Sequence, residues 1–213
     1  WPKVITDKGG IRHQFHHVID IVPTILEAAG ISQPEYVDGI KQGPIEGVSM
    51  MYTFDKKNAD APSTHKTQYF EMMADRAIYN DGWIAGTKVM RPPWVNFPPK
   101  ESALDYPWEL YDLRSDWTQS EDLAAKNPAK LKELQELFWK EAEKYQVLPL
   151  DKSMVARIIT PRPSLTAGRT VFTWTRPLTG TPNGDAPNLL NSSYNFKAEV
   201  EIPQGGAEGM LIT

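Results

Sequence analysis

Apolar side chains recur at helical spacing near the start of the chain, from Ile11 onward. Pro23 interrupts this pattern because it lacks a backbone N–H, so we expect two pieces with the proline in the first turn of the second. That second helix should run to Ala29 and end at Gly30, a good C-cap. The residues before Gly9-Gly10 are typical of a strand end followed by a turn.

A proline- and glycine-rich loop is expected at 31–64, with a short helical turn near Ser49–Tyr52. Alternating stretches then predict four strands, at Thr67–Met72, Arg76–Asn80, Gly82–Thr87 and Trp108–Leu113. Asn80-Asp81-Gly82 predicts a tight hairpin turn between the second and third, since Asp-Gly accepts positive φ angles. Together these strands should form a small antiparallel sheet.

The clearest helix begins after Asn127, a good N-cap, with Pro128 at the first helical position. Lysine and glutamate fill one face of this segment, and the other face is apolar. The apolar positions are Leu131, Leu134, Phe138, Ala142 and Tyr145. We therefore expect a long helix that covers one side of the sheet.

The character of the chain changes after Pro149. Residues 151–213 are rich in Thr, Ser, Pro and Gly, and they contain two strand-like runs, Thr170–Thr175 and Phe196–Ile202. These runs suggest the start of an incomplete β-sandwich. The fold class is therefore α/β (α+β) in three parts: 1–64, a sheet-and-helix subdomain at 65–150, and a β-rich extension at 151–213.

Composition narrows the choice of partners. The net charge is −4, which does not suggest a nucleic-acid-binding surface. No apolar run approaches the roughly 20 residues that span a bilayer, so no membrane partner is expected and the protein should be soluble. The chain has no cysteine, which excludes disulfides, thiolate metal sites and a cysteine nucleophile. Both cytoplasm and periplasm remain open as compartments.

Three segments, in order, carry a resemblance to a known family. Residues 15–31 include Asp20-Ile21-Val22-Pro23-Thr24 and end in Ala29-Gly30-Ile31; residues 77–88 contain the turn Asp81-Gly82-Trp83; and Glu109-Leu110-Tyr111-Asp112-Leu113 leads into Pro128. This ordered set resembles type I sulfatases, and in particular the C-terminal part of the longer bacterial arylsulfatases. The resemblance spans about residues 1–150.

The resemblance implies a fold like that of alkaline phosphatase and hydrolysis of sulfate esters. Such enzymes use a formylglycine made within a Cys/Ser-x-Pro-x-Arg motif, and a calcium ion held by Asp and Asn oxygens, which suit a hard cation. Residues 1–30 would then be a strand–helix remnant of the large α/β sulfatase domain. Their apolar face, Ile19, Val22, Ile25 and Leu26, should be exposed or poorly packed without that domain.

None of the family's catalytic constellation is found in this sequence, which has no Cys, no Ser-x-Pro-x-Arg and no Asp-Asp or Asp-Asn pair. We therefore assign no catalytic residue and no cofactor to this chain, and expect it to be inactive alone. Calcium and formylglycine are expected in the full-length parent. Its partners would be the upstream catalytic α/β domain of the same polypeptide and a sulfate-ester substrate.

A few side chains remain as site candidates. His13, His16, His17 and Asp20 are spaced so that i,i+4 pairs on a helix could hold a metal or exchange protons, or could simply form a helix surface or domain contact. Arg91 and Trp94 lie on a proline-rich loop that could border a substrate cleft.

Two alternative functions are weighed against the sulfatase. A phosphodiesterase or phosphonate hydrolase of the same superfamily could share this C-terminal half, because function depends on the site and not on the fold. A non-catalytic glycan-binding module could reside in the β-rich tail from about residue 151. The nucleophile and metal ligands upstream would discriminate the first alternative, and glycan binding by the tail the second.

Overall fold

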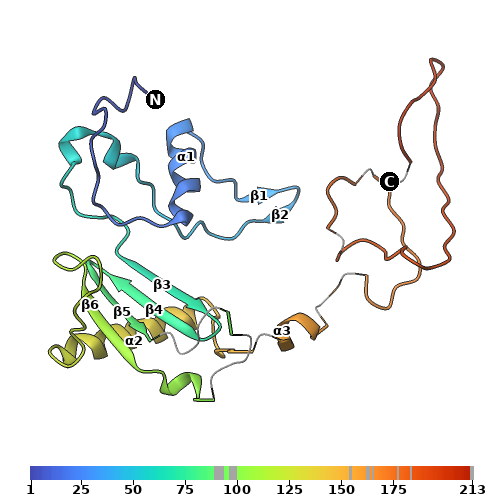
Figure 1. Ribbon diagram of the computed structural model, residues 1–213. Helices are drawn as coiled ribbons and strands as arrows, with labels where there is room; N and C mark the ends of the chain where they lie inside the picture. The colour runs from blue at the N-terminus through green and yellow to red at the C-terminus, as the bar shows by residue number, and fades with distance from the viewer. Residues whose placement is uncertain are drawn as a thin grey trace. The chain divides into compact units, whose positions relative to one another are not determined.

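The computed structural model divides into two compact units, residues 1–158 and 159–213, which are considered separately (Figure 1). The residues described are 1–88, 94–95, 100–153, 155–161, 164, 166–176, 178–182 and 184–211. Within these ranges, no helix combines the length and apolar character that crossing a membrane requires. The three-part division at 64 and 150 stays a prediction.

A four-stranded antiparallel sheet forms the centre of the first unit. Its strands are β3 (Thr67–Met72), β4 (Asp75–Asn80), β5 (Trp83–Thr87) and β6 (Trp108–Asp112), and they lie side by side in chain order. The predicted meander is therefore confirmed, with boundaries that agree to within one residue. Pairing of Ile78 with Ala85 and of Ala85 with Leu110 sets the register, so these small and branched residues share one face.

Two-residue turns join the first three strands. Between β4 and β5, Asp81 and Gly82 take φ angles of 44° and 91°, as the Asp-Gly dipeptide predicts. Between β3 and β4 the same left-handed conformation falls on Met73 and Ala74, with φ of 54° and 73°. The Met73-Ala74 turn contains no glycine or asparagine from which it could be predicted. The Glu71 carboxylate stabilises it by accepting a hydrogen bond from the Ala74 N–H at 2.8 Å.

Helix α2 (Pro128–Lys144) covers one face of this sheet, behind the strands in Figure 1. The apolar face predicted for it is confirmed: Leu134, Phe138 and Ala142 are fully buried against Ile78, Ala85 and Leu110. Arg76 lies between the rings of Trp108 and Trp139, 5.1 and 5.3 Å from their centres. Asn127 precedes the helix as expected, but its side chain makes no capping hydrogen bond.

The N-terminal segment differs in part from the sequence prediction. Helix α1 (Ile21–Ala29) follows the 3₁₀ turn η1 (Val18–Asp20), and Gly30 ends it with φ 67°, as expected. Residues 11–17, however, are not helical, so the expectation of a first helical piece there is wrong. The strand end expected at Trp1 is a turn, closed by Ile5 N–H on the Trp1 carbonyl, because a strand needs a neighbour for its hydrogen bonds.

The stretch at 31–64 is more structured than a loop. A small hairpin, β1 (Tyr36–Val37) and β2 (Ile40–Lys41), turns at Asp38-Gly39. The helical turn expected near Ser49–Tyr52 is confirmed as η2 (Met51–Phe54), and η3 (Lys56–Asn58) follows it. A further 3₁₀ turn, η4 (Ala103–Asp105), precedes β6.

The prediction of strands beyond residue 150 is wrong. Helix α3 (Val155–Ile159) is the last regular element among the described residues, and neither 170–175 nor 196–202 forms a strand. Alternation alone gives a strand no partner for its backbone, and the Pro- and Gly-rich surroundings favour turns. An incomplete β-sandwich is therefore absent from the described part of 159–211.

Candidate functional site

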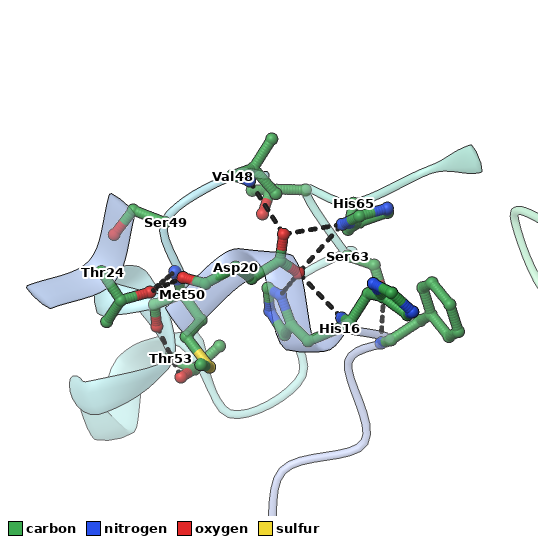
Figure 2. A network of polar contacts seen from close by, with 12 residues as sticks. His16, Asp20, Thr24, Val48, Ser49, Met50, Thr53, Ser63 and His65 are labelled. Carbon is green, nitrogen blue, oxygen red and sulfur yellow. Dashed lines mark hydrogen bonds and ion pairs between the residues drawn. The ribbon is translucent and has the colours of Figure 1, made fainter. Parts of the chain in front are cut away.

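The most concentrated polar cluster of the first unit surrounds Asp20, whose carboxylate is fully buried (Figure 2). Four N–H groups converge on its two oxygens at 2.8–2.9 Å: the backbone amides of His17 and Val48 and the Nδ1 atoms of His16 and His65. These donors come from the two residues before η1, from the loop before η2, and from the residues just before β3. One side chain thus joins three segments distant in sequence.

The outer nitrogens of the two imidazoles have different partners. His65 Nε2 lies 3.1 Å from the Thr67 carbonyl oxygen, which can only accept, as can the carboxylate at Nδ1. A neutral ring can donate from only one nitrogen, so the two contacts of His65 are satisfied together only by the doubly protonated ring. His16 Nε2 lies 3.2 Å from the Tyr52 hydroxyl, which can donate, so a neutral His16 satisfies both of its contacts.

Thr24 extends the cluster along α1. Its hydroxyl donates to the Asp20 carbonyl at 2.6 Å and accepts from the Met50 N–H at 2.9 Å. Gly47 packs so closely here that a Cβ atom would lie 2.1 Å from the Ile19 carbonyl oxygen. The close approach lets the neighbouring Val48 N–H reach the carboxylate, so the absence of a side chain at position 47 supports the cluster.

Hydrogen bonding outweighs burial at Asp20. Burial alone would raise the pKa of this carboxyl, but the hydrogen bonds from His17, Val48, His16 and His65 favour the charged form and lower the pKa to about 2. Asp20 is therefore ionised at neutral pH. A carboxylate held this way stabilises the fold and does not act as a general base near pH 7.

The cluster does not fit a metal ion. Cations such as calcium need unoccupied oxygen lone pairs, and N–H donors already occupy both carboxylate oxygens of Asp20. Within the described part of the chain, no three His, Asp or Glu side chains are placed to share a metal. The arrangement joins polypeptide segments and offers no coordination site.

The sequence-predicted site residues separate in the structure. His16 and Asp20 meet, across the 3₁₀ turn rather than along a helix. His17 reaches Asp20 through its backbone N–H, and His13 is exposed. Trp94 is 80% exposed, and Arg91 lies outside the described residues.

Sequence reasoning missed His65 and Tyr52. Their distance along the chain from Asp20 hides the contact, and no local spacing connects them. His65 falls between the predicted loop at 31–64 and the predicted strand Thr67–Met72, where no sequence pattern singles it out.

A cavity of about 740 Å³ lies beside the cluster. Every residue of β3 lines it, with His17 and His65 from the cluster and Glu141 and Tyr145 from the end of α2. Carboxylates predominate among its charged side chains, namely Glu46, Glu71, Asp75, Glu109 and Glu141. Among the described residues that line it, Arg76 carries the one guanidinium, which is turned inward between two tryptophan rings and is only 3% exposed.

No family model matches the chain. Among solved structures it is similar to BT4656, solved in complex with its substrate D-glucosamine-2-N,6-O-disulfate, with 19% identity over 63% of this chain and a TM-score of 0.40. It is also similar to Ps i-CgsB in complex with k-i-k-neocarrahexaose, with 21% identity over 65% of this chain and a TM-score of 0.43.

A third similar structure is BT33336S-sulf, solved in connection with the metabolism of multiple glycosaminoglycans by Bacteroides thetaiotaomicron. It is 19% identical over 57% of this chain, with a TM-score of 0.38. This chain spans about a quarter of the length of each of these proteins, 25%, 27% and 24% respectively.

Proposed function

We propose that this chain is the C-terminal portion of a sulfate-ester hydrolase of the type I sulfatase kind, in which it supports a catalytic α/β domain upstream in the same polypeptide. The chain supplies scaffold and no catalytic group. Its parent would hydrolyse the sulfur–oxygen bond of a sulfate ester.

One observation carries the proposal: α1 turns its apolar residues outward. Ile21, Val22 and Ile25 are 45%, 53% and 60% exposed, while the one buried residue of the helix is Thr24. A surface helix normally buries its apolar side, so this helix requires a partner on its outer side. The catalytic domain expected before residue 1 is the partner we propose.

The order and packing of the resembling segments support the same reading. Phe15, in the first segment, stacks on Tyr79 of the second with ring centres 3.7 Å apart. The third segment pairs with the second, since β5 and β6 are neighbours in the sheet. The three stretches that resemble the family therefore belong to one packed unit.

Chemistry would reside in the parent's upstream domain. When bound there, formylglycine and calcium would supply the nucleophile and the charge stabilisation that sulfate transfer needs. Two observations support placing both groups upstream: N–H donors occupy the Asp20 carboxylate, and the sequence has no cysteine. This chain's residues would position, through α1, the domain that contains them.

The decisive experiment compares the longer polypeptide with this chain. The coding sequence upstream of Trp1 should contain Cys/Ser-x-Pro-x-Arg and an early Asp-Asp pair. The longer protein should hydrolyse p-nitrophenyl sulfate or D-glucosamine-2-N,6-O-disulfate, and this chain alone should lose at least the ~10⁶-fold enhancement typical of enzymes. Turnover by this chain alone, or an upstream sequence without those motifs, would overturn the proposal.

A phosphodiester, bis-p-nitrophenyl phosphate, serves as the matched control substrate. Preference of the longer protein for the phosphodiester over the sulfate ester would favour the phosphodiesterase of the same superfamily.

Arg91 and Trp94, which fall between β5 and β6 in the sequence, are proposed to border the substrate cleft of the parent. Trp94 offers an exposed ring for stacking. Arg91→Ala and Trp94→Ala in the longer protein should raise KM with little change in kcat. Trp117→Ala removes an equally exposed ring, 79% against 80%, and is the control. An unchanged KM in both variants would remove these residues from the site.

A further inference from the structure

Strand β3 is an edge strand: one side pairs with β4, and no strand among the described residues pairs with the other. The Asp81 N–H donates to the Lys66 carbonyl, so Lys66 belongs to a hydrogen-bonded pair of the antiparallel ladder. Alternation then directs the backbone groups of Gln68, Phe70 and Met72 toward β4. The backbone groups of Thr67, Tyr69 and Glu71 point away from the sheet.

Side chains of this chain already cover two of the outward carbonyls. His65 Nε2 lies 3.1 Å from the Thr67 oxygen, and Gln68 Nε2 donates to the Tyr69 oxygen at 2.7 Å. The outward N–H groups of Tyr69 and Glu71 have no hydrogen-bond partner within the described part of the chain. The edge is thus shielded only where a side chain can fold back over it, which is how proteins keep a bare strand edge from pairing at random.

All of β3 lines the cavity described above, which also extends across the sheet to Ala77 of β4, Ile84 of β5 and Tyr111 of β6. Among the described residues its charged lining is mostly acidic, and the Arg76 guanidinium lies between Trp108 and Trp139. Glu46 and Glu109 are paired with Lys144 and Lys88, so Glu71 and Glu141 are the carboxylates offered to a ligand. Glu141 and Tyr145, at the end of α2, border the edge on the side of the helix. Ile19 and His17 border it on the side of the Asp20 cluster. The unpaired edge of β3 therefore borders a groove in which Glu71 and Glu141 offer carboxylates to a cationic side chain.

We propose that this groove binds an extended basic peptide, which adds to β3 as a fifth strand. Backbone hydrogen bonds to the Tyr69 and Glu71 amides would align the peptide, and lysine or arginine side chains would meet the carboxylates of the groove. Gln68 acts as a gate, because its amide occupies the Tyr69 carbonyl that the added strand would use. The partner is a segment of another protein, and the interaction is independent of sulfate-ester hydrolysis.

Binding is tested on the full chain with a blocked peptide of alternating lysine and valine, labelled for fluorescence anisotropy. The peptide of alternating glutamate and valine is the charge control, and the lysine peptide N-methylated at alternate amides is the backbone control. Only the unmodified lysine peptide should bind, and amide hydrogen exchange should slow at Tyr69 and Glu71. Equal binding of the N-methylated peptide, or protection elsewhere in the sheet, would overturn strand addition.

Two variants sharpen the test. Glu141→Lys should weaken binding by roughly five- to tenfold at low salt, whereas Glu136→Lys, on the same helix but outside the groove, should change it less than about twofold. Gln68→Ala should strengthen binding by about threefold, since it frees the Tyr69 carbonyl at the loss of one hydrogen bond. Weaker binding by Gln68→Ala, or equal effects of the two helix variants, would contradict the proposal.

A second copy of the chain is the competing occupant of the edge. Sedimentation velocity of the chain without peptide distinguishes the two. A dimer that dissociates on addition of the lysine peptide supports the groove but replaces the partner by a self-pairing edge, which overturns the proposal as stated. If the peptide does not bind, the sulfatase proposal is unaffected, because the sulfatase proposal is tested by the sequence upstream of Trp1.

Discussion

Helices α1 and α2 differ in which of their side chains they bury. Helix α2 has a polar, lysine- and glutamate-rich sequence, yet it buries Leu134, Phe138 and Ala142 completely against the sheet. Helix α1 is far more apolar, yet inside this chain it buries only Thr24. Packing of a continuous apolar core holds α2 to the sheet. A buried carboxylate and its hydrogen bonds hold α1 to the rest of the unit.

The difference shows that an apolar helix face is not always turned into the chain that contains it. The polar side of α1 faces inward because the Asp20 carboxylate and the Thr24 hydroxyl accept hydrogen bonds from the Val48 and Met50 N–H groups. Those contacts fix the direction of the helix, and its apolar side is left for a partner.

The largest effect is expected in the core under α2. Phe138→Ala removes a fully buried ring that packs on Trp108, with ring centres 5.8 Å apart, and should lower the free energy of unfolding by about 4 kcal/mol. Urea unfolding followed by tryptophan fluorescence measures the change. Ile25→Ala, on the outward side of α1, is the control and should stay within about 0.5 kcal/mol. Similar losses for the two variants would mean that α1 is buried in solution.

The sequence could predict the half of the molecule that contains α2. Strand alternation, the Asp81-Gly82 turn and the apolar face of α2 are local patterns, and the structure confirms each of them. The Met73-Ala74 turn has no local signal, because its positive φ angles depend on Glu71 and on the register of the strands.

The Asp20 cluster lay beyond sequence reasoning for a different reason. His16 and Asp20 could be paired by spacing, but His65 and Val48 approach only when the loop at 31–64 folds back. Contacts at such separations are properties of the tertiary fold. The prediction of strands after residue 150 was wrong for the opposite reason: the local alternation is present, but no neighbouring strand pairs with it in the described residues.

Acid should loosen the attachment of α1 more than the core under α2. The pKa of Asp20 is about 2 in the folded chain against an ordinary 3.8, so its contribution is complete above about pH 3.8 and is lost as the pH falls through 2. The shift corresponds to about 2 kcal/mol. Unfolding free energies of wild type and Asp20→Asn, measured from pH 6 to pH 2, should therefore converge at the acid end.

Asp116 provides the matched control for this titration. Hydrogen bonds from the backbone amides of Glu121 and Ser120 lower the pKa of Asp116 to about 2 as well, but these contacts lie on an exposed loop. Solvent screens the charge of such a group. The difference in unfolding free energy between wild type and Asp116→Asn should therefore change far less between pH 6 and pH 2. A difference between wild type and Asp20→Asn that stays constant with pH would contradict the role assigned to Asp20.

A smaller loss is expected at the loop that closes over the cluster. Gly47→Ala places a Cβ atom against the Ile19 carbonyl oxygen, so the backbone must shift and the Val48 N–H must withdraw from Asp20. We expect a loss of roughly 1 to 2 kcal/mol, measured by urea unfolding. Gly43→Ala, where a Cβ would meet nothing within 4 Å, is the control. Equal stability of the two variants would show that the close approach is not needed.

Ile25→Asp should change the stability of the chain least of all, while it clearly reduces self-association. Ile25→Asp places a charge on the outward face of α1, where the side chain is 60% exposed, so the free energy of unfolding should change by less than about 0.5 kcal/mol. Self-association of the isolated chain, measured by light scattering, should nevertheless fall because the apolar patch is broken. In the longer polypeptide the same substitution would bury an unpaired charge under the catalytic domain, and should lower stability by several kcal/mol. If it left both proteins equally stable, α1 would have no partner on its outer side and its exposed face would need another explanation.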